Sequence, residues 1–498
     1  MNVTLMSFDR ELYCIGIRII SAVLRKAGHN VQCVFLPTEY ETRSSLGIFQ
    51  KYYPENLLDS LYSLCCRSDL IGMSLMTNQF IQAVQVTKFL KEKNSKAFIV
   101  WGGIEPTVEP DECLKFADAV CLGEGEEAII EIAGRIEKGE DYSDIPNIWI
   151  KHNGEVRRNP LRPLEANLDV IPLPDYSCQN HFIGIDGRLE TLTKEKLINF
   201  KGERFVSQKE GISYSVITSR GCPFACTYCC NSVYKELYHK EKRLRWRSVG
   251  NVIQELRMIQ EEVAAIRFIY MVDDNFTSRS SGKLEQFLQK YQEEINIPFA
   301  VQISPLTINK EKLDILFNYG CVKLTMGVET ANLRVSKIYG RERFHKQLPR
   351  AIDLVERYRP RMKIPPTYQF IIDNPYETLD ETLESLNFAA ALPKPWNNPV
   401  YSLMLFPGTG LYKKAREDGL IYDKYSQIYG RNWLDQSEPF FQLWIWLYRA
   451  NMPRVVLRLL LKKTLVRVMT RPVMRKTLRV SAKFKNRVAY FILRLIRS

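Results

Sequence analysis

Two successive series of alternating strand-like and helix-like patterns limit the folds that this chain can adopt. In the first series, apolar strand candidates recur at 3–8, 31–36, 70–75, 97–101 and 119–122. In the second, strand candidates recur at 214–218, 266–272, 299–303, 322–326, 368–372 and 400–405. Amphipathic helical patterns separate the strands in both series, and strands joined by helices form parallel sheets. The sequence therefore predicts an α/β fold.

The first series predicts a doubly wound, flavodoxin-like sheet of five parallel strands. Ligands bind such sheets beyond the carboxyl ends of the strands, where the strand order reverses. Glycine at that edge lets a ligand approach the backbone, and it is equally typical of a tight turn. The candidate ligand contacts at the strand ends are Ser74, Gly102, Gly103, Gly123, Glu124, Gly125 and Glu126.

The second series predicts a partial (β/α)6 barrel, with its active site at the carboxyl ends of the strands. Between the two series the sequence becomes polar and proline-rich, as in IPLPD at 171–175, which indicates a linker with an insertion. The predicted division of the chain is a first domain at 1–158, a linker at 159–211, a barrel at 212–420 and a basic helical extension at 421–498.

The net charge of +14 is confined to the end of the chain. Residues 449–498 contain 15 Lys or Arg and no Asp or Glu, while the remainder contains 55 basic and 56 acidic residues. Nucleic-acid-binding proteins usually carry their basic excess around the active domain, so this distribution argues against nucleic acid as the partner. The first residues do not resemble a secretory signal, and the apolar stretch 440–448 is shorter than the ~20 residues that cross a bilayer. We expect a cytoplasmic protein.

One cysteine-rich loop follows the first barrel strand. It reads SRGCPFACTYCCN at 219–231, which places Cys222, Cys226 and Cys229 at spacings of x3 and x2. Thiolates are the usual ligands of iron–sulfur clusters, and three of them leave the fourth iron of a 4Fe-4S cubane open for chemistry. The alternatives are a zinc site that uses Cys230 as its fourth ligand, or buried cysteines without metal.

The segment CPFACTYC resembles the cluster motif of the radical S-adenosylmethionine (SAM) superfamily, including the aromatic Tyr228 before the last cysteine. The resemblance implies that the open iron binds the amino and carboxylate groups of SAM. It also implies that an electron from a donor such as flavodoxin or ferredoxin cleaves SAM to a 5′-deoxyadenosyl radical, which removes hydrogen from a substrate carbon.

Three later strand ends resemble the SAM-contacting positions of the same superfamily. Asp273 and Asp274 in MVDDNF match its acidic contact to the SAM ammonium group, although such residues also cap helices. Glu329 in GVET resembles the GxES motif. Ile372 lies in FIIDNPYET, which is similar to IIGxPGET but has Asp373 and Tyr376 in place of glycine. The resemblance implies that these residues contact SAM.

The first domain resembles the cobalamin-binding domain of B12-dependent radical SAM proteins, through GGIEPTVEP at 102–110, LGEGEE at 122–127 and LDVIPLPDY at 168–176. The resemblance implies that cobalamin contacts Ser74, Gly102, Gly103, Gly123, Glu124 and Gly125. Many cobalamin proteins coordinate cobalt through DxHxxG, but the corresponding loop from Asp9 to Gly16 has no histidine. His29 precedes a strand, a place typical of structural histidines. We predict cobalt without a histidine ligand; the alternative is a degenerate domain retained for packing.

The leading hypothesis for the reaction is a cobalamin-dependent methyl transfer to an unactivated carbon of a lipid, a lipid-linked molecule or a secondary metabolite. In this reaction one SAM supplies the methyl group through cobalamin and another SAM supplies the radical. One alternative keeps both cofactors and performs a cyclisation or rearrangement without methyl transfer. Another is a binding protein that senses redox state or light.

The basic extension interleaves cations with apolar residues at near-helical spacing, at 455–467 and again at 488–496. Such helices lie in lipid interfaces, where each cation near anionic headgroups contributes ~1 kcal/mol. Residues 449–498 therefore predict a peripheral contact with the inner face of the cytoplasmic membrane. The alternatives are a solvated helix pair packed on the barrel, or RNA binding.

Overall fold

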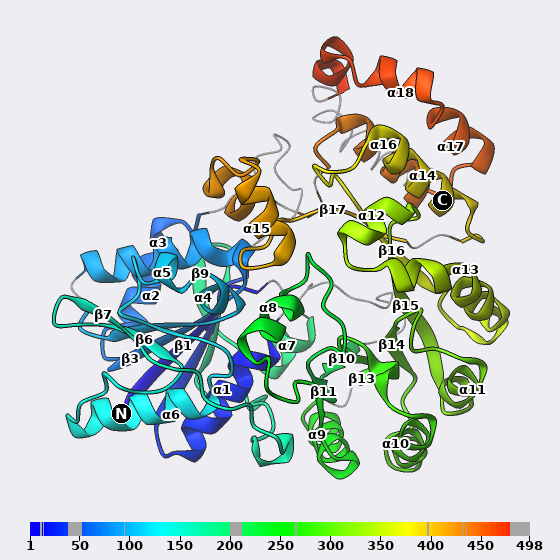
Figure 1. The fold of residues 1–498 in the computed structure, drawn as a ribbon. Coiled ribbons are helices and arrows are strands. Elements are labelled where there is room, and N and C mark those ends of the chain that lie inside the picture. The colour runs from blue at the N-terminus through cyan, green and yellow to red at the C-terminus, as the bar shows by residue number, and fades with distance from the viewer. Residues whose placement is uncertain are drawn as a thin grey trace.

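A computed structural model describes residues 1–9, 12, 14–37, 52–93, 95–199, 212–263, 266–395, 398–431, 433–434 and 436–478. Figure 1 shows two α/β units side by side, one blue to cyan and one green to yellow, with the last helices at the edge of the second unit. Each unit contains one of the two predicted series of strands.

The centre of the first unit is a parallel sheet with the strand order β5-β4-β3-β1-β2. The strands are β1 (Asn2–Ser7), β2 (Asn30–Phe35), β3 (Leu70–Leu75), β4 (Phe98–Gly103) and β5 (Ala119–Cys121). Alternate strand residues face opposite sides, so α1 (Ile15–Lys26) and α6 (Glu126–Lys138) cover one face, and α2 (Glu55–Cys65) and α3 (Phe80–Glu92) cover the other. The predicted doubly wound sheet is confirmed, and its order reverses between β1 and β3, which marks the expected ligand crevice.

This sheet is wider than the five strands predicted from the sequence. A hairpin of β6 (Ile148–His152) and β7 (Glu155–Arg158) extends one edge, and β8 (His181–Ile185) and β9 (Arg188–Thr191) extend the other to nine strands. Strands β8 and β9 come from the segment predicted as a linker. Asp175 holds this segment against α1, because its carboxylate contacts Arg25 at 2.9 Å and the Ser21 hydroxyl at 2.7 Å.

The second unit is an open sheet of six parallel strands in sequence order, as predicted. The strands are β10 (Ile212–Val216), β13 (Ile266–Met271), β14 (Phe299–Ile303), β15 (Cys321–Glu329), β16 (Thr367–Ile372) and β17 (Val400–Ser402). The main helices between them are α9 (Val249–Glu262), α10 (Ser281–Glu294), α11 (Lys310–Asn318), α13 (Glu342–Arg357) and α14 (Leu379–Ala391). In Figure 1 these helices line the outer side of the curved sheet. Its inner side and the carboxyl ends of its strands therefore remain available for a functional site.

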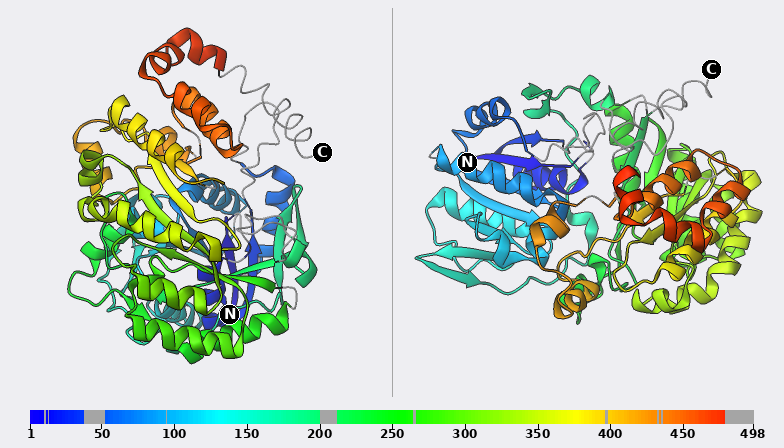
Figure 2. Two further views of the ribbon diagram at one scale, coloured as in Figure 1. Left: turned by 90° about the vertical axis from the view of Figure 1, so that its right-hand side faces the viewer. Right: turned by 90° about the horizontal axis from the view of Figure 1, so that it is seen from above.

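The extension begins with a turn at Tyr425–Tyr429 that returns to the first unit, where the Tyr429 ring stacks on Phe80 at 4.1 Å between centroids. It continues as α16 (Pro439–Arg449), α17 (Arg454–Leu460) and α18 (Lys463–Met469), and Figure 2 shows the last two on the outside of the second unit. No helix in the described ranges is long and apolar enough to cross a membrane. The predicted basic stretch at 488–496 lies outside the described residues.

Candidate functional site

The three candidate cluster cysteines lie on a loop at the carboxyl end of β10. The loop passes through β11 (Ser219–Arg220) and turns at Gly221, which has a φ of +86°. A Cβ at this position would lie 2.4 Å from the Arg243 carbonyl oxygen, so the turn requires glycine. Cys229 then precedes α8 (Cys230–Leu237). Backbone hydrogen bonds from the Thr227 N–H to the Tyr339 carbonyl, 3.1 Å, and from the Leu411 N–H to the Thr227 carbonyl, 2.8 Å, fix the middle of the loop.

The environment of these cysteines favours a bound cationic group. Burial raises the pKa of Cys222 to about 12 and raises the pKa of Cys226, although Arg341 opposes the second shift. The hydrogen bond with Cys230 lowers the pKa of Cys229. Thiolates become the stable form at such buried positions when a metal supplies positive charge, so the donor set fits an iron–sulfur cluster.

Two side chains donate hydrogen bonds to the sulfur atoms. The Arg341 guanidinium, itself buried, lies 3.4 Å from the Cys226 Sγ, and the Asn231 amide lies 3.7 Å from the Cys229 Sγ. Among the described residues, no group of three or more His, Cys, Asp or Glu side chains is arranged to hold a single metal ion.

The two neighbouring aspartates have different environments. Asp273 is buried, and its carboxylate accepts hydrogen bonds from the Thr218 N–H, 3.1 Å, the Thr218 hydroxyl, 2.8 Å, and the Ser219 hydroxyl. These bonds fix the start of the cysteine loop and leave Asp273 little capacity for a ligand. Asp274 lines a cavity between the two units and accepts a 3.1 Å hydrogen bond from the Asn231 amide, so Asp274 is the better candidate for a SAM contact.

Tyr228 and Glu329, which the sequence predicted as SAM contacts, lie together beside Arg341. Burial raises the pKa of Glu329, while Arg341, 4.0 Å away, and a hydrogen bond with Tyr228 oppose the shift. Glu329 has a φ of +67°, and a Cβ at Gly327 would lie 2.2 Å from its Oε1. The strained backbone thus turns this carboxylate toward the cysteine loop.

Ile372 is fully buried at the end of β16, and its carbonyl accepts a 2.7 Å hydrogen bond from the Leu403 N–H. Its backbone is therefore committed to the sheet. Sequence reasoning missed Glu377, which lies five residues after Ile372. Both of its carboxylate oxygens are buried, and neither has a partner at hydrogen-bond distance and angle. Burial raises the pKa of Glu377 to about 8. A carboxyl group with a strongly raised pKa is a candidate for a functional role. The sequence could have indicated Glu377, because it belongs to the segment FIIDNPYET that resembles a superfamily motif.

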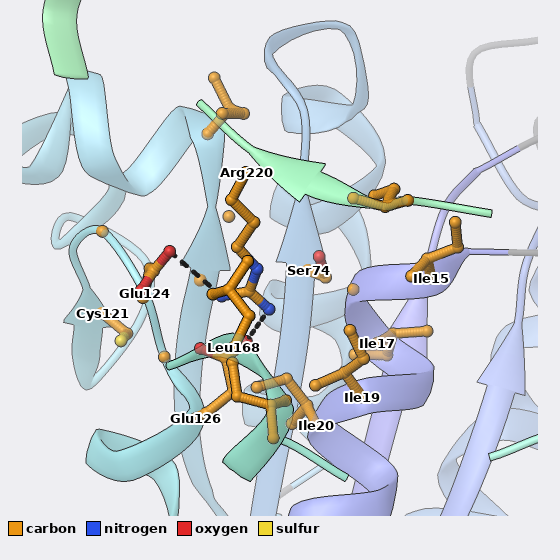
Figure 3. A pocket seen from close by; sticks show the side chains of 18 of the residues that line it. Ile15, Ile17, Ile19, Ile20, Ser74, Cys121, Glu124, Glu126, Leu168 and Arg220 are labelled. Carbon is orange, nitrogen blue, oxygen red and sulfur yellow. Dashed lines mark hydrogen bonds and ion pairs between the residues drawn. The ribbon is translucent and has the colours of Figure 1, made fainter. Parts of the chain in front are cut away.

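A cavity of about 620 Å³ joins the two units at their carboxyl edges. All of the candidate cobalamin contacts line it: Ser74, Gly102, Gly103, Gly123, Glu124 and Gly125. Cys230, Asn231 and Asp274 line it from the second unit. Figure 3 shows Ile15, Ile17, Ile19 and Ile20 of α1 along one side of this cavity, with Glu124 and Arg220 along the other. The structure therefore brings the strand-end residues of the first unit and the end of the cysteine loop into one chamber.

The chamber is large and is lined mainly by apolar side chains and glycine backbone, a lining that lets a large cofactor approach the backbone. It extends into the crevice between β1 and β3, where Leu5, Gly72 and Val100 line its floor. At the rim, Gly103 has a φ of +98°, and a Cβ there would lie 2.7 Å from the Leu75 carbonyl oxygen, so this close approach of backbones requires glycine. Among the described residues that line the chamber there is no histidine. Arg10, Glu11 and Tyr13 of the loop before α1 lie outside the described residues.

Glu124 is held by arginines of the second unit. Arg245 binds both of its carboxylate oxygens, at 2.6 and 3.0 Å, and Arg220 lies 3.1 Å from Oε1. Burial alone would raise the pKa of Glu124, but the two arginines outweigh it and hold this pKa below its usual value. Glu124 therefore joins the two units, a role that its sequence neighbours did not indicate, because Arg245 is 121 residues away.

Comparison with protein-family models assigns both units. The model of the radical SAM superfamily matches residues 216–389, and that of the B12 binding domain matches residues 1–133. The chain belongs to the B12-binding radical SAM proteins. Its cofactors are accordingly a 4Fe-4S cluster, SAM and cobalamin, and the fit of the cysteine loop and of the chamber agrees with this assignment.

Relatives and solved structures agree with the family. The B12-binding radical SAM protein is 29% identical to "uncharacterized methyltransferase PH0819" of Pyrococcus horikoshii, over 72% of this chain and 73% of that protein. It is 21% identical to the anaerobic magnesium-protoporphyrin IX monomethyl ester cyclase of Rubrivivax gelatinosus, over 73% and 61%. The structure of the radical SAM methyltransferase TsrM from Kitasatospora setae, with cobalamin and a [4Fe-4S] cluster bound, has a TM-score of 0.61 at 16% identity and covers 84% of this chain and 78% of that one. This last likeness shows a shared fold.

Proposed function

We propose that this B12-binding radical SAM protein is an enzyme that transfers a methyl group to a carbon of a small-molecule substrate. The observation that carries the proposal is the single chamber lined both by the cobalamin-contact residues of the first unit and by Asn231 and Asp274 beside the cysteine loop. Methyl transfer to a carbon radical requires the radical source and the methyl carrier to reach the same substrate atom, so one shared chamber meets this requirement. The methyltransferase name of a relative adds support.

We assign the site residues accordingly. Cys222, Cys226 and Cys229 hold the cluster; Tyr228, Asp274 and Glu329 surround SAM; and Ser74, Gly102, Gly103, Gly123, Glu124 and Gly125 surround cobalamin. Ile372, predicted from the sequence as a SAM contact, is buried and bonded within the sheet, so we assign it a supporting place in β16. Asp273 positions the cysteine loop, because its carboxylate is already bonded to Thr218 and Ser219. When bound, the cluster supplies the electron that cleaves SAM to a radical, and cobalamin carries the methyl group. We retain the domain limits 1–158, 212–420 and 421–498 and assign 181–191 to the first sheet.

The protein's own residues orient these groups and exclude water from them. The isoleucines of α1 form an apolar wall, and the glycine edge lets the corrinoid lie close to the backbone. Arg341 and Asn231 direct hydrogen bonds at two cluster sulfurs, and burial raises the pKa of Asp274, which the Asn231 amide partly opposes. Radicals react with water and oxygen, so a largely apolar chamber protects the intermediate.

A cyclisation or rearrangement without methyl transfer is the second candidate, and the Rubrivivax gelatinosus cyclase supports it. Anaerobic incubation of the reconstituted protein with methyl-labelled SAM, a reductant and candidate substrates separates the two. Label in the product supports methyl transfer, whereas 5′-deoxyadenosine with an altered but unlabelled product supports rearrangement. Formation of neither would leave the cofactors in a sensing role and would contradict the proposal.

We further propose that a flavodoxin or ferredoxin delivers the electron, and that the extension docks the enzyme on anionic lipid to reach a lipid-linked substrate. Val455 and Leu459 of α17 are 69% and 46% exposed, and Val468 and Val473 are 44% and 76% exposed. Arg458, Lys462 and Arg467 are interleaved with them. Exposed apolar side chains among cations are typical of helices that lie in a lipid interface.

The membrane proposal is tested by sedimenting the full-length protein with anionic or neutral vesicles. We expect binding to anionic vesicles that weakens with salt, and loss of binding when Val455, Leu459 and Val473 are replaced by Ser. Replacement of Tyr422, which is 84% exposed outside these helices, is the matched control. Equal sedimentation of the triple variant and the wild type would contradict the proposal and leave the radical chemistry untouched.

A further inference from the structure

Arginine–glutamate contacts join the candidate cluster loop directly to the candidate cobalamin loop. Arg220, two residues before Cys222, contacts Glu124 at 3.1 Å and Glu126 at 2.5 Å. Arg245, on the strand paired with β11, holds both oxygens of Glu124. Glu124 lies in the turn between β5 and α6, and Glu126 is the first residue of α6; both are next to the glycines that line the chamber. One electrostatic cluster therefore bridges the two loops.

The contacts are largely shielded from solvent. The side chains of Arg245 and Glu124 are 7% and 20% exposed, so salt screens this pair less than a surface pair. The two parallel bonds between the Arg245 guanidinium and the Glu124 carboxylate fix the relative orientation of these side chains in addition to their distance. Arg220 and Arg245 both come from the short antiparallel pair β11 and β12 (Arg245–Trp246), which leads into the cysteine loop.

A second contact joins the other end of the cysteine loop to the same turn. Helix α8 begins directly after Cys229, and Tyr238 follows its last residue. A Cβ at Gly123 would lie 2.0 Å from the Tyr238 hydroxyl oxygen, so the ring lies directly against this glycine. The cysteine loop is thus anchored on both sides to residues 123–126.

We propose that Arg220 is a positioning residue that sets the separation between the cluster, with its bound SAM, and cobalamin. This inference rests on the proposed function, because it requires both cofactors in the chamber. Arg220 acts through Glu124 and Glu126 and not on the reacting atoms. Replacing it releases one tie between the two loops while the three cysteines and the glycine edge remain. Misplacement by about 1 Å can slow a reaction about a hundredfold.

The test compares Arg220→Met and Arg220→Lys in the holoenzyme with cluster and cobalamin loaded. The first readout is the magnetic interaction between cob(II)alamin and the reduced cluster, measured by electron paramagnetic resonance without substrate. The second is the rate at which the SAM methyl group is transferred to cobalamin, followed by absorbance. We expect Arg220→Met to bind both cofactors, to weaken or broaden the magnetic interaction and to slow methyl transfer about a hundredfold. Arg220→Lys retains the charge and should recover part of both.

Arg162→Met is the matched control. Arg162 pairs with Glu127 and Glu131 of the same helix α6, but the ion pairs stay within the first unit. The inference is supported if Arg162→Met behaves like the wild type while Arg220→Met changes both readouts. Equal losses of the magnetic interaction and of the methyl-transfer rate in Arg162→Met and Arg220→Met would overturn it. An unchanged magnetic interaction in Arg220→Met would also overturn it. If Arg220→Met fails to bind a cofactor, Arg220→Lys decides by the same two readouts. A wild type that binds no cobalamin would instead refute the proposed function.

Discussion

Replacing Arg341 by Met tests the electrostatics of the cluster site most directly. The guanidinium donates a hydrogen bond to the Cys226 Sγ at 3.4 Å and another to the Gly327 carbonyl at 2.8 Å, and it is buried. A reduced cluster carries one more negative charge than an oxidised one, so a buried cation beside a ligand sulfur stabilises the reduced state. Loss of Arg341 should therefore lower the midpoint potential of the cluster.

The size of the effect follows from the strength of such a contact. Hydrogen bonds to charged groups contribute about 1.5–3 kcal/mol, and about 59 mV corresponds to a tenfold change for a one-electron couple. Since a tenfold change is about 1.4 kcal/mol, the expected shift is about −60 to −120 mV. Burial already raises the pKa of Glu329, and the loss of Arg341 removes the charge that opposes this shift.

The assay is a redox titration of the reconstituted, SAM-free protein, followed by electron paramagnetic resonance. Arg334→Met is the matched control, because its guanidinium contacts Glu381 and the Tyr376 carbonyl. We expect its midpoint potential to equal that of the wild type. An Arg341→Met protein with full iron content and an unchanged or raised potential would refute the reasoning.

Three further predictions follow from other parts of the site. Gly103→Ala should abolish tight cobalamin binding, measured by absorbance after gel filtration, because its Cβ would clash with a carbonyl oxygen of β3 at 2.7 Å. Gly28→Ala is the control, because Gly28 also has a positive φ, +90°, but no atom lies within 4 Å of the position of an added Cβ. This variant should retain cobalamin binding, although the backbone strain costs about 1–3 kcal/mol of stability. Asp273→Asn should lower the iron content, because it disturbs the start of the cysteine loop, whereas Asp274→Asn should keep the iron and weaken SAM binding in equilibrium dialysis. Burial raises the pKa of Glu377 from 4.5 to about 8, so its stabilising contribution is complete below about pH 4.5 and is lost as the pH rises toward 8. Glu377→Gln should therefore reduce the fall in the urea midpoint over that range, and an identical pH dependence in the two proteins would contradict the assignment.

Both parallel sheets could be predicted because their strands are continuous apolar runs separated by amphipathic helices. Strands β8 and β9 could not, since HFIGI and RLET are short and mix polar with apolar residues. Strand β8 depends on pairing with the edge of β2, for example Cys33 with His181, and β9 depends on pairing with β8; local sequence does not encode either pairing.

The site was predictable to the level of strand ends and not to the level of individual contacts. Ser74 and the glycines reach the chamber because the carboxyl ends of parallel strands meet at one edge. Asp273 and Asp274 are adjacent and chemically identical, so only the tertiary structure separates the buried one from the one that lines the chamber. The partner of Glu124 is similarly set by the docking of two units, since Arg245 belongs to a different sheet.

The turn at Tyr425–Tyr429 determines how the two units can separate. The linker is one connection between them, and the stacking of Tyr429 on Phe80, with the Lys424–Glu109 ion pair at 2.9 Å, is a second attachment on the way back. Separation of the two units therefore requires more than bending at the linker, since the aromatic stack, this ion pair and the contacts of Arg220 and Arg245 with Glu124 must break as well.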